Sequence, residues 1–261
     1  MEFANINPKD NAKIFDSHAH YDDERFDGII DELLPKIHKM GVERIINCGC
    51  DSLTNKKCLA LADKFSFVYS AVGIHPCNVD SGTAVADIHE YAKHKKCVAI
   101  GEIGLDYYWE PEKKETQKKI FKEQLLLAKE LDLPVIVHDR DAHGDVLEIL
   151  KEYKPKGVVH SFSGSVEMAE EILKLGMYLG IGGVITFNNA KKLPEVVKML
   201  PLDRLLLETD APYLTPVPFR GKTNHSEMIY LTAKKIAEIK NKTLEEILKI
   251  SFENAKNLFN V

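Results

Sequence analysis

The stretch PVIVHDRDAHGDVLEILKEYKPKGVVHS, from Pro134 to Ser161, contains the unit that decides the fold. It opens with a β-branched run at 134–138, continues through a longer segment of helical period, and ends with a second β-branched run at 157–161. This order predicts two parallel strands joined by a crossover helix. His138 and His160 fall at the carboxyl ends of the two runs.

The same unit recurs along the whole chain. After the first run, Ile30, Leu33, Leu34 and Ile37 have the i, i+3, i+4 spacing of an amphipathic helix. The expected strands are 14–18, 43–49, 67–73, 97–102, 134–138, 157–161, 177–182 and 204–208. Eight strand–helix units in 261 residues favour an α/β fold, a (β/α)8 TIM barrel forming a single domain over 1–261. The alternative is an open doubly wound sheet, but its usual phosphate loop, GxGxxG or a P-loop, is absent from the sequence.

Composition and charge exclude several classes of protein. With 44% hydrophobic and 29% charged residues the chain matches an ordinary globular protein, and its net charge of −5 argues against sequence-blind binding of nucleic acid through a basic face. No apolar run is long enough to span a bilayer, and the polar N-terminus shows no secretion signal. Five cysteines without CxxC spacing fit reduced thiols, so we expect a cytoplasmic protein, with no obligate protein partner evident.

Imidazole and carboxylate side chains gather at the carboxyl ends of the expected strands. They are His18, His20, Glu102, His138, His160, Glu208 and Asp210. In a parallel barrel these strand ends open onto one face, so the side chains converge. Taken singly, each histidine could be a core residue and Asp210 a turn residue. Taken together they predict a metal site, because buried polar groups need partners.

The size of this set indicates two ions. The four histidines with Glu102 and one carboxylate from the end of strand eight, Asp210, are too many for one tetrahedral site, but they suit two cations that share a bridging carboxylate. Glu102 is the expected bridge, because its strand lies between the strand of His18 and the strands of His138 and His160. The mixture of donors does not distinguish Mg, Mn and Zn.

Eight motifs carry a family resemblance. In chain order they are FDSHAH (15–20), GIHP (73–76), GEIGLDYY (101–108), VHDRDA (137–142), HSFSG (160–164), LLLETDAPYL (205–214), RGKTN (220–224) and ENAKNLF (253–259). With these motifs the sequence resembles the TatD family of metal-dependent hydrolases, within the amidohydrolase-like barrels. The resemblance implies a barrel that binds two divalent cations and hydrolyses phosphodiester bonds in DNA, often from strand ends.

The resemblance also implies a ligand for each position. His18 and His20 with Asp210 correspond to the ligands of the first metal, His138 and His160 to those of the second, and Glu102 to the bridge. These are the residues that the strand ends bring together.

The sequence departs from the family pattern at a few positions. Ala19 and Tyr21 stand where Cys and Leu are common, Cys77 follows GIHP where a second His is frequent, and His225-Ser226 replaces a common Glu-Pro. None of these departures removes a ligand. The last two affect residues expected near the substrate.

Further residues are candidates for catalysis and substrate binding. Asp210 is the expected acceptor of the water proton, unless it serves as a ligand only. His75 is either a donor to a phosphate oxygen or leaving group, or a structural polar residue. Arg140 and Arg220 are candidate phosphate clamps because guanidinium matches phosphate, the alternative being surface ion pairs. Tyr108, with Tyr107 and Trp109, could stack on a base of a DNA single strand or strand end, or only pack the loop.

Two other functions remain open. A metal-dependent ester or amide hydrolase, such as a deacylase, would use the same pair of ions to activate water. Many such barrels have a carboxylated Lys as the bridge, so Glu102 favours the phosphodiester reaction. A binding protein without turnover is the third possibility, and the full ligand set argues against it.

Overall fold

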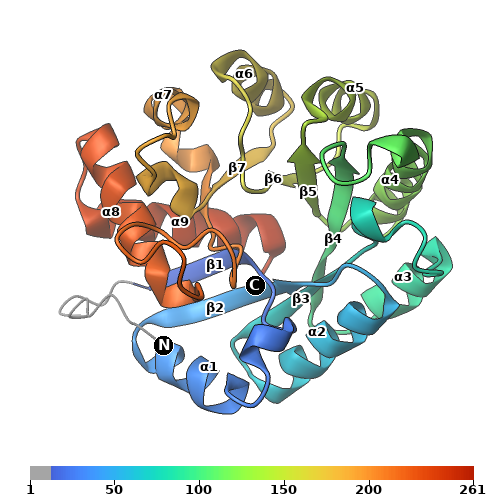
Figure 1. The fold of residues 1–261 in the computed structure, drawn as a ribbon, viewed down its shortest axis with the longest axis horizontal. Coiled ribbons are helices and arrows are strands. Elements are labelled where there is room, and N and C mark those ends of the chain that lie inside the picture. Colours follow the sequence, from blue (N-terminus) through green and yellow to red (C-terminus); the bar gives the residue numbers. More distant parts are fainter. Residues whose placement is uncertain (1–12) are drawn as a thin grey trace.

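Eight parallel strands form one sheet in the computed structural model, which describes residues 13–261 (Figure 1). The strands pair in chain order, β1 with β2 through to β7 with β8. Their bounds are β1 Ile14–Ala19, β2 Val42–Cys48, β3 Val68–Val72, β4 Cys97–Asp106, β5 Val135–Arg140, β6 Gly157–Val159, β7 Tyr178–Ile181 and β8 Leu205–Leu207. The expected (β/α)8 barrel is confirmed.

Helices alternate with the strands and surround the sheet (Figure 1). They are α1 Ile30–Lys39, α2 Ser52–Lys64, α3 Val85–Ala92, α4 Lys114–Glu130, α5 His143–Tyr153, α6 Val166–Lys174, α7 Lys192–Met199, α8 Ile229–Lys240 and α9 Leu244–Phe259. Local chemistry fixes several of their starts. At α2, for example, the Asp51 carboxylate accepts the Thr54 amide and the Thr54 hydroxyl accepts the Asp51 amide, a reciprocal cap that satisfies amides lacking a helical partner.

The seam between β8 and β1 closes just beyond the last strand. No continuous ladder joins these two strands in the described part of the chain, but Ala19 and Ala211 form a parallel bridge. The amide of His20 donates to the carbonyl of Ala211 at 2.7 Å, and the amide of Asp210 donates to the carbonyl of His18 at 3.0 Å. The barrel is therefore nearly closed, and the closure lies at the carboxyl ends of the strands.

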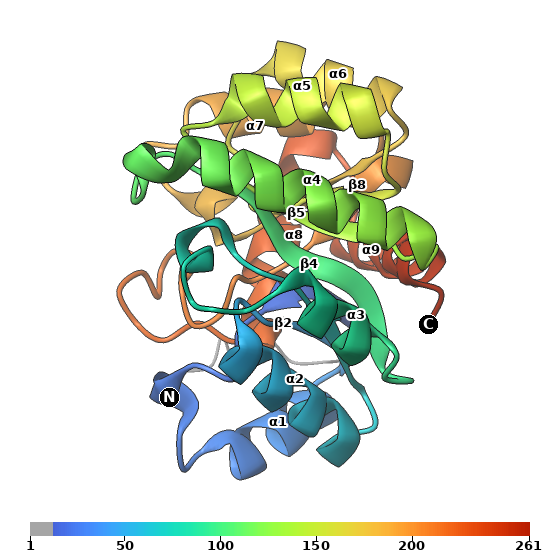
Figure 2. The same ribbon diagram turned by 90° about the vertical axis from the view of Figure 1, so that its right-hand side faces the viewer.

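Helix α9 seals the opposite end of the barrel. Its Phe252 and Phe259 contact Phe15 of β1, with ring centroids 6.0 and 6.1 Å apart. These rings join a small cluster of inward-facing strand residues, separate from the larger core between strands and helices. Figure 2 shows α9 on the side away from the long orange loop that follows β8. The strand-end side is thus left as the open face.

The largest error in the predicted strand boundaries is at strand four. Strand four was expected to end at Glu102, but β4 continues to Asp106, because residues 103–106 pair with 137–140 of β5. The extension places Asp106 on the same strand face as Glu102, four residues further on.

Residues 1–12 lie outside the described residues. They are part of the single domain expected over 1–261, and the expected lack of a secretion signal also concerns them. Within 13–261, no helix has the length and apolar character needed to cross a membrane.

Candidate metal centre

Three side chains at the β1–β8 seam and one from β4 form what we call the first donor group: His18, His20 and Asp210 with Glu102. The Nε2 atoms of His18 and His20 are 3.0 Å apart. Each lies 3.5 Å from Asp210 Oδ1, and they lie 3.4 and 3.3 Å from Glu102 Oε2. Two strands and the loop after β8 thus direct four donor atoms at one point.

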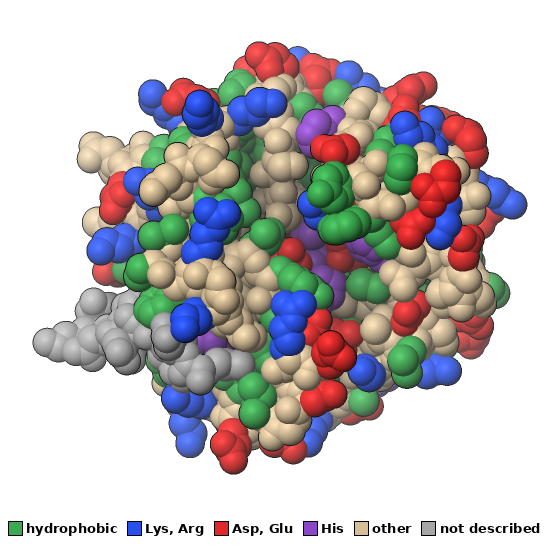
Figure 3. Space-filling model, in the orientation of Figure 1, with side chains coloured by type: hydrophobic (Ala, Val, Ile, Leu, Met, Phe, Trp, Pro, Cys, Tyr) green, Lys and Arg blue, Asp and Glu red, His purple; other side chains and the backbone are tan. Residues whose placement is uncertain are grey.

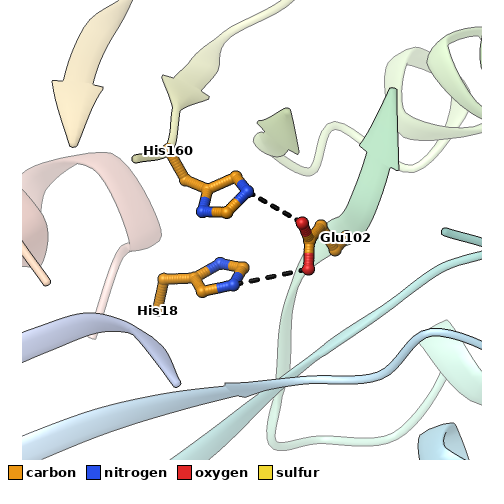
Figure 4. A group of neighbouring side chains, drawn as sticks. All are labelled: His18, Glu102 and His160. Atoms are coloured by element: carbon orange, nitrogen blue, oxygen red, sulfur yellow. Dashed lines mark ion pairs between the residues drawn. The ribbon is translucent and has the colours of Figure 1, made fainter. Parts of the chain in front are cut away.

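Glu102 also belongs to a second donor group, with His138 and His160. Its Oε1 lies 2.7 Å from His138 Nδ1 and 2.8 Å from His160 Nε2, and these two nitrogens are 3.2 Å apart. Figure 4 shows the Glu102 carboxylate, carried by β4, with one oxygen toward His160 and the other toward His18. The two carboxylate oxygens therefore face different donor groups.

The spacing of the donor atoms fits bound cations. A tetrahedral ion with bonds of about 2.0–2.1 Å separates its ligand atoms by about 3.3–3.4 Å. The first donor group, with separations of 3.0–3.5 Å, is close to this spacing. The second, with separations of 2.7–3.2 Å, has the shorter spacing of hydrogen bonds and would widen slightly around an ion. Histidine nitrogens with carboxylate oxygens are a donor set for Zn and Mn, and a carboxylate alone for Mg.

The electrostatics of the centre also favour a cation. Burial alone would raise the pKa of Glu102, but the surrounding imidazoles, led by His160, hold it well below its usual value. Burial would lower the pKa of His18 and His20, yet Glu102 and Asp210, with neighbouring thiols, raise both well above the usual value. The carboxylates thus stay ionised and draw positive charge to this point. Bound cations would replace the imidazole protons.

Groups behind the histidines select which ring nitrogen faces the centre. His20 Nδ1 lies 2.9 Å from the carbonyl oxygen of Cys48, which can only accept, so His20 Nε2 presents its lone pair to the first donor group. His138 Nε2 lies 3.1 Å from Asp106 Oδ2, so its Nδ1 faces the second donor group. Carboxylate or carbonyl partners of this kind orient ligating histidines and raise their basicity. Sequence reasoning missed Asp106.

Asp16 is a second residue that sequence reasoning missed. Its carboxyl group is fully buried and accepts the hydroxyl of Thr209 at 2.5 Å and the amide of Thr209 at 3.0 Å. Thr209 precedes Asp210, whose backbone lies in the left-handed region at φ 56°, a conformation that Asp tolerates better than most residues. Asp16 therefore fixes the segment that carries Asp210 against the strand that carries His18.

His75 lies above the bridge, in the loop after β3. Its Nε2 is 3.5 Å from Glu102 Oε1, and its Nδ1 accepts the amide of Cys77 at 3.1 Å. Accepting at Nδ1 puts the proton of the neutral ring on Nε2, and burial lowers the pKa of His75, which favours the neutral form. His75 thus presents an N–H donor to the centre. The backbone of Cys77 is what orients it.

Glu208 lies behind His160 and outside both donor groups. It is fully buried, and its Oε1 accepts the amide of Ser161 at 2.6 Å and lies 3.7 Å from His160 Nδ1. Of the two acidic residues expected at the end of strand eight, only Asp210 reaches the donor atoms.

Three expected substrate residues gather at the edge of the open face. The guanidinium of Arg140 lies 4.2 Å from the ring centre of Tyr108 and 5.5 Å from that of Trp109, and the two rings are 53% and 62% exposed. We call Tyr108, Trp109 and Arg140 the rim platform. Within 13–261, no carboxylate forms an ion pair with Arg140, so the surface ion pair is not formed. Figure 3 shows histidine side chains deep in a hollow of this face.

The remaining candidates serve the loops. The hydroxyl of Tyr107 donates to Asp145 at 2.6 Å. Tyr107 therefore does not share the base-stacking role expected of Tyr108. Arg220 stacks on Phe187, at 4.4 Å, and joins the loop after β8 to the segment after β7. His225 and Ser226 are fully buried, so these departures from the family pattern do not face a substrate.

Comparisons with known proteins identify the family. A family model described as "TatD related DNase" matches residues 15–260. The chain belongs to the TatD family. YabD of Bacillus subtilis, an uncharacterized metal-dependent hydrolase, is 46% identical over 253 residues, covering 95% of this chain and 99% of YabD.

Two solved TatD structures share the fold over nearly the whole chain. YjjV, a TatD homologue from Escherichia coli, superimposes with a TM-score of 0.91 and 35% identity, covering 97% of this chain and 100% of YjjV. A TatD family hydrolase from Entamoeba histolytica gives a TM-score of 0.85 and 26% identity, covering 95% and 98%. The chain is thus a metal-dependent hydrolase of the TatD family, with a cluster of His, Glu and Asp as its candidate metal centre.

Proposed function

We propose that this TatD protein hydrolyses phosphodiester bonds of DNA, in single strands or at strand ends, with two divalent cations held by the two donor groups. The observation that supports the proposal best is the Glu102 carboxylate, whose Oε2 faces His18 and His20 while its Oε1 faces His138 and His160. When bound, a pair of cations lowers the pKa of water and neutralises charge on the phosphoryl oxygens.

The chain's own residues have distinct roles in this reaction. The histidines His18 and His20 hold the pKa of Asp210 well below its usual value against the effect of burial, so Asp210 is ionised. Its position beside the first donor group, and not its basicity, makes it the candidate acceptor for the proton of the attacking water. His75 Nε2–H donates to a phosphoryl oxygen or to the leaving group. Glu102 fixes the position of the two donor groups relative to each other, because it contributes one carboxylate oxygen to each.

Substrate binding is assigned to the open face. Arg140, with no carboxylate partner in the described chain, offers its donor fork to a phosphate, and Tyr108 offers an exposed ring to a base. Arg220, in the loop after β8, is the second candidate cation. With a net charge of −5 the affinity comes from few contacts, so binding of duplex DNA is weak.

The test uses metal-stripped protein with end-labelled single- and double-stranded DNA and a panel of esters and amides. Mg, Mn and Zn are added back separately. We expect metal-dependent shortening of the single strand, and a loss of at least about a hundredfold in Glu102→Gln, since removing the bridging charge weakens both donor groups. Glu115→Gln, at a side chain 90% exposed on α4, is the matched control and should keep the wild-type rate.

Two results would refute the proposal. Rapid turnover of an ester or amide with intact DNA would assign the centre to the alternative hydrolase. A Glu102→Gln protein that cuts DNA at the wild-type rate would exclude the bridging role.

A further inference from the structure

The carboxylate of Asp106 contacts both the floor and the edge of the open face. Its Oδ2 lies 3.1 Å from His138 Nε2, on the side of the ring away from the second donor group. Its Oδ1 accepts the amides of Tyr108 at 3.0 Å and Trp109 at 2.9 Å. The side chain is 1% exposed. One buried carboxylate therefore joins a candidate metal ligand to the backbone of the rim platform.

The backbone of Asp106 is held from the other side. Gln117 of α4 accepts the Asp106 amide at 2.9 Å, and its side-chain amide donates to the Asp106 carbonyl at 2.9 Å. Gln117 is itself buried. Because the backbone is fixed at both polar groups, the orientation of the carboxylate depends on its two remaining contacts, His138 and the amides of 108–109.

A cation in the second donor group would act on this carboxylate through the imidazole. Coordination at Nδ1 of a histidine draws electron density from the ring, which makes Nε2–H a stronger donor to its carboxylate partner. A firmer bond from His138 holds Asp106 in the orientation that also accepts the two platform amides. The rim platform is ordered by the same step.

We propose that Asp106 is a positioning residue that couples cation occupancy of the second donor group to the seating of the rim platform, so that cation and nucleotide each raise the affinity for the other. Reciprocity follows from linkage, whichever binds first. The inference rests on the proposed function only in taking the platform as the place where a nucleotide binds.

Trp109 is the chain's single tryptophan, so its emission reports the platform directly. Metal-free protein is titrated with Zn²⁺, which does not quench by paramagnetism, while zinc binding is followed by calorimetry. In the wild type we expect a saturable change in emission as the second donor group fills. Asp106→Ala should bind zinc more weakly and lose this change.

Asp106→Asn prevents the side chain from making both contacts at once. An amide group can accept the amides of 108–109 or accept from His138, but its nitrogen then faces the wrong partner on the other side, so one contact is always lost. We expect about 10–100-fold weaker zinc binding at the second donor group. The matched control is Asp145→Asn on α5, which removes the charge paired with Lys118 beside the Tyr107 hydroxyl; no hydrogen bond or ion pair joins Asp145 to His138 or Trp109 in the described residues, so its response should equal that of the wild type.

The reciprocal arm uses thymidine 5′-monophosphate, which has no phosphodiester bond to cleave. Zinc at saturation should lower its Kd in both proteins through direct contact with the phosphate, and by about fivefold or more further in the wild type than in Asp106→Asn. Equal emission changes in wild type and Asp106→Ala, or a zinc-dependent change in Kd that is the same in wild type and Asp106→Asn, would overturn the inference. Protein that shows the coupling but leaves DNA intact would refute the proposed function alone. Protein that cuts DNA without the coupling would refute this inference alone.

Discussion

The Asp16→Asn substitution removes a charge from a carboxyl group that the fold buries completely. Burial raises the pKa of Asp16 from its ordinary 3.8 to about 6, and the hydrogen bonds from Thr209 oppose this rise only in part. An asparagine keeps an oxygen to accept the hydroxyl or amide of Thr209 and has nearly the same volume. The change therefore isolates the cost of the buried charge.

The sign follows from the direction of the shift. Because the pKa of Asp16 is higher in the folded chain than in the unfolded chain, its contribution to stability is fully present below 3.8 and is lost as the pH rises to about 6. A shift of about two units corresponds to about 3 kcal/mol. About 2 kcal/mol of this loss falls between pH 4.5 and pH 8. Asparagine has no such loss, so the variant gains this amount relative to the wild type over that range.

The assay is urea unfolding of chelator-treated protein at pH 4.5 and pH 8, followed by circular dichroism. Subtracting the free energy of unfolding of the wild type from that of the variant cancels the histidines and carboxylates that titrate in both proteins. Asp203→Asn, at a side chain 72% exposed, is the control and should shift by less than about 0.5 kcal/mol. If the difference between Asp16→Asn and wild type is the same at both pH values, the reasoning is wrong.

Three further predictions concern the loop after β8, the platform and the cations. Asn224→Ala removes buried donors to the carbonyls of Thr209 and Tyr213. It should cost about 2 kcal/mol and lower Tm by about 4–8 °C in calorimetry, and an unchanged Tm would contradict this. Arg140→Ala should raise KM for single-stranded DNA about tenfold with kcat nearly unchanged; Arg140→Lys should not restore KM, since an ammonium lacks the planar fork, and full rescue by Lys would exclude the stacked clamp. Chelation should lower stability by about 2.7 kcal/mol relative to protein with cation at a hundredfold excess over Kd, measured as a Tm shift; an equal Tm would mean that the folded chain holds no ion.

The sequence predicted the fold and the donor atoms for the same reason. Eight runs of β-branched residues at regular intervals predict parallel strands, and parallel strands place their carboxyl ends on one face. The sequence could thus predict that His18, His138 and His160 lie close together, although they are far apart in the chain. Their assignment as metal ligands stays a prediction.

The residues that sequence reasoning missed act through contacts that have no local signal. Asp16 binds Thr209, 193 residues away, across the seam between β1 and β8. Asp106 was hidden because strand four was ended at Glu102, although a two-residue period would have placed both on one face. The pairing of Arg140 with Tyr108 rather than with a neighbouring acid depends on how two loops pack.

The seam of the barrel has a consequence for how the molecule comes apart. In residues 13–261, ladders join all neighbouring strands except the last and the first, between which a single bridge forms at Ala19 and Ala211. His18 and His20 lie on the β1 side of that junction, and Asp210 lies on the β8 side. An ion bound by these three residues would cross-link the first and last strands of the barrel. We expect β1 and β8 to separate before any other pair of strands once the ion is lost, so that loss of activity and unfolding begin at the same place.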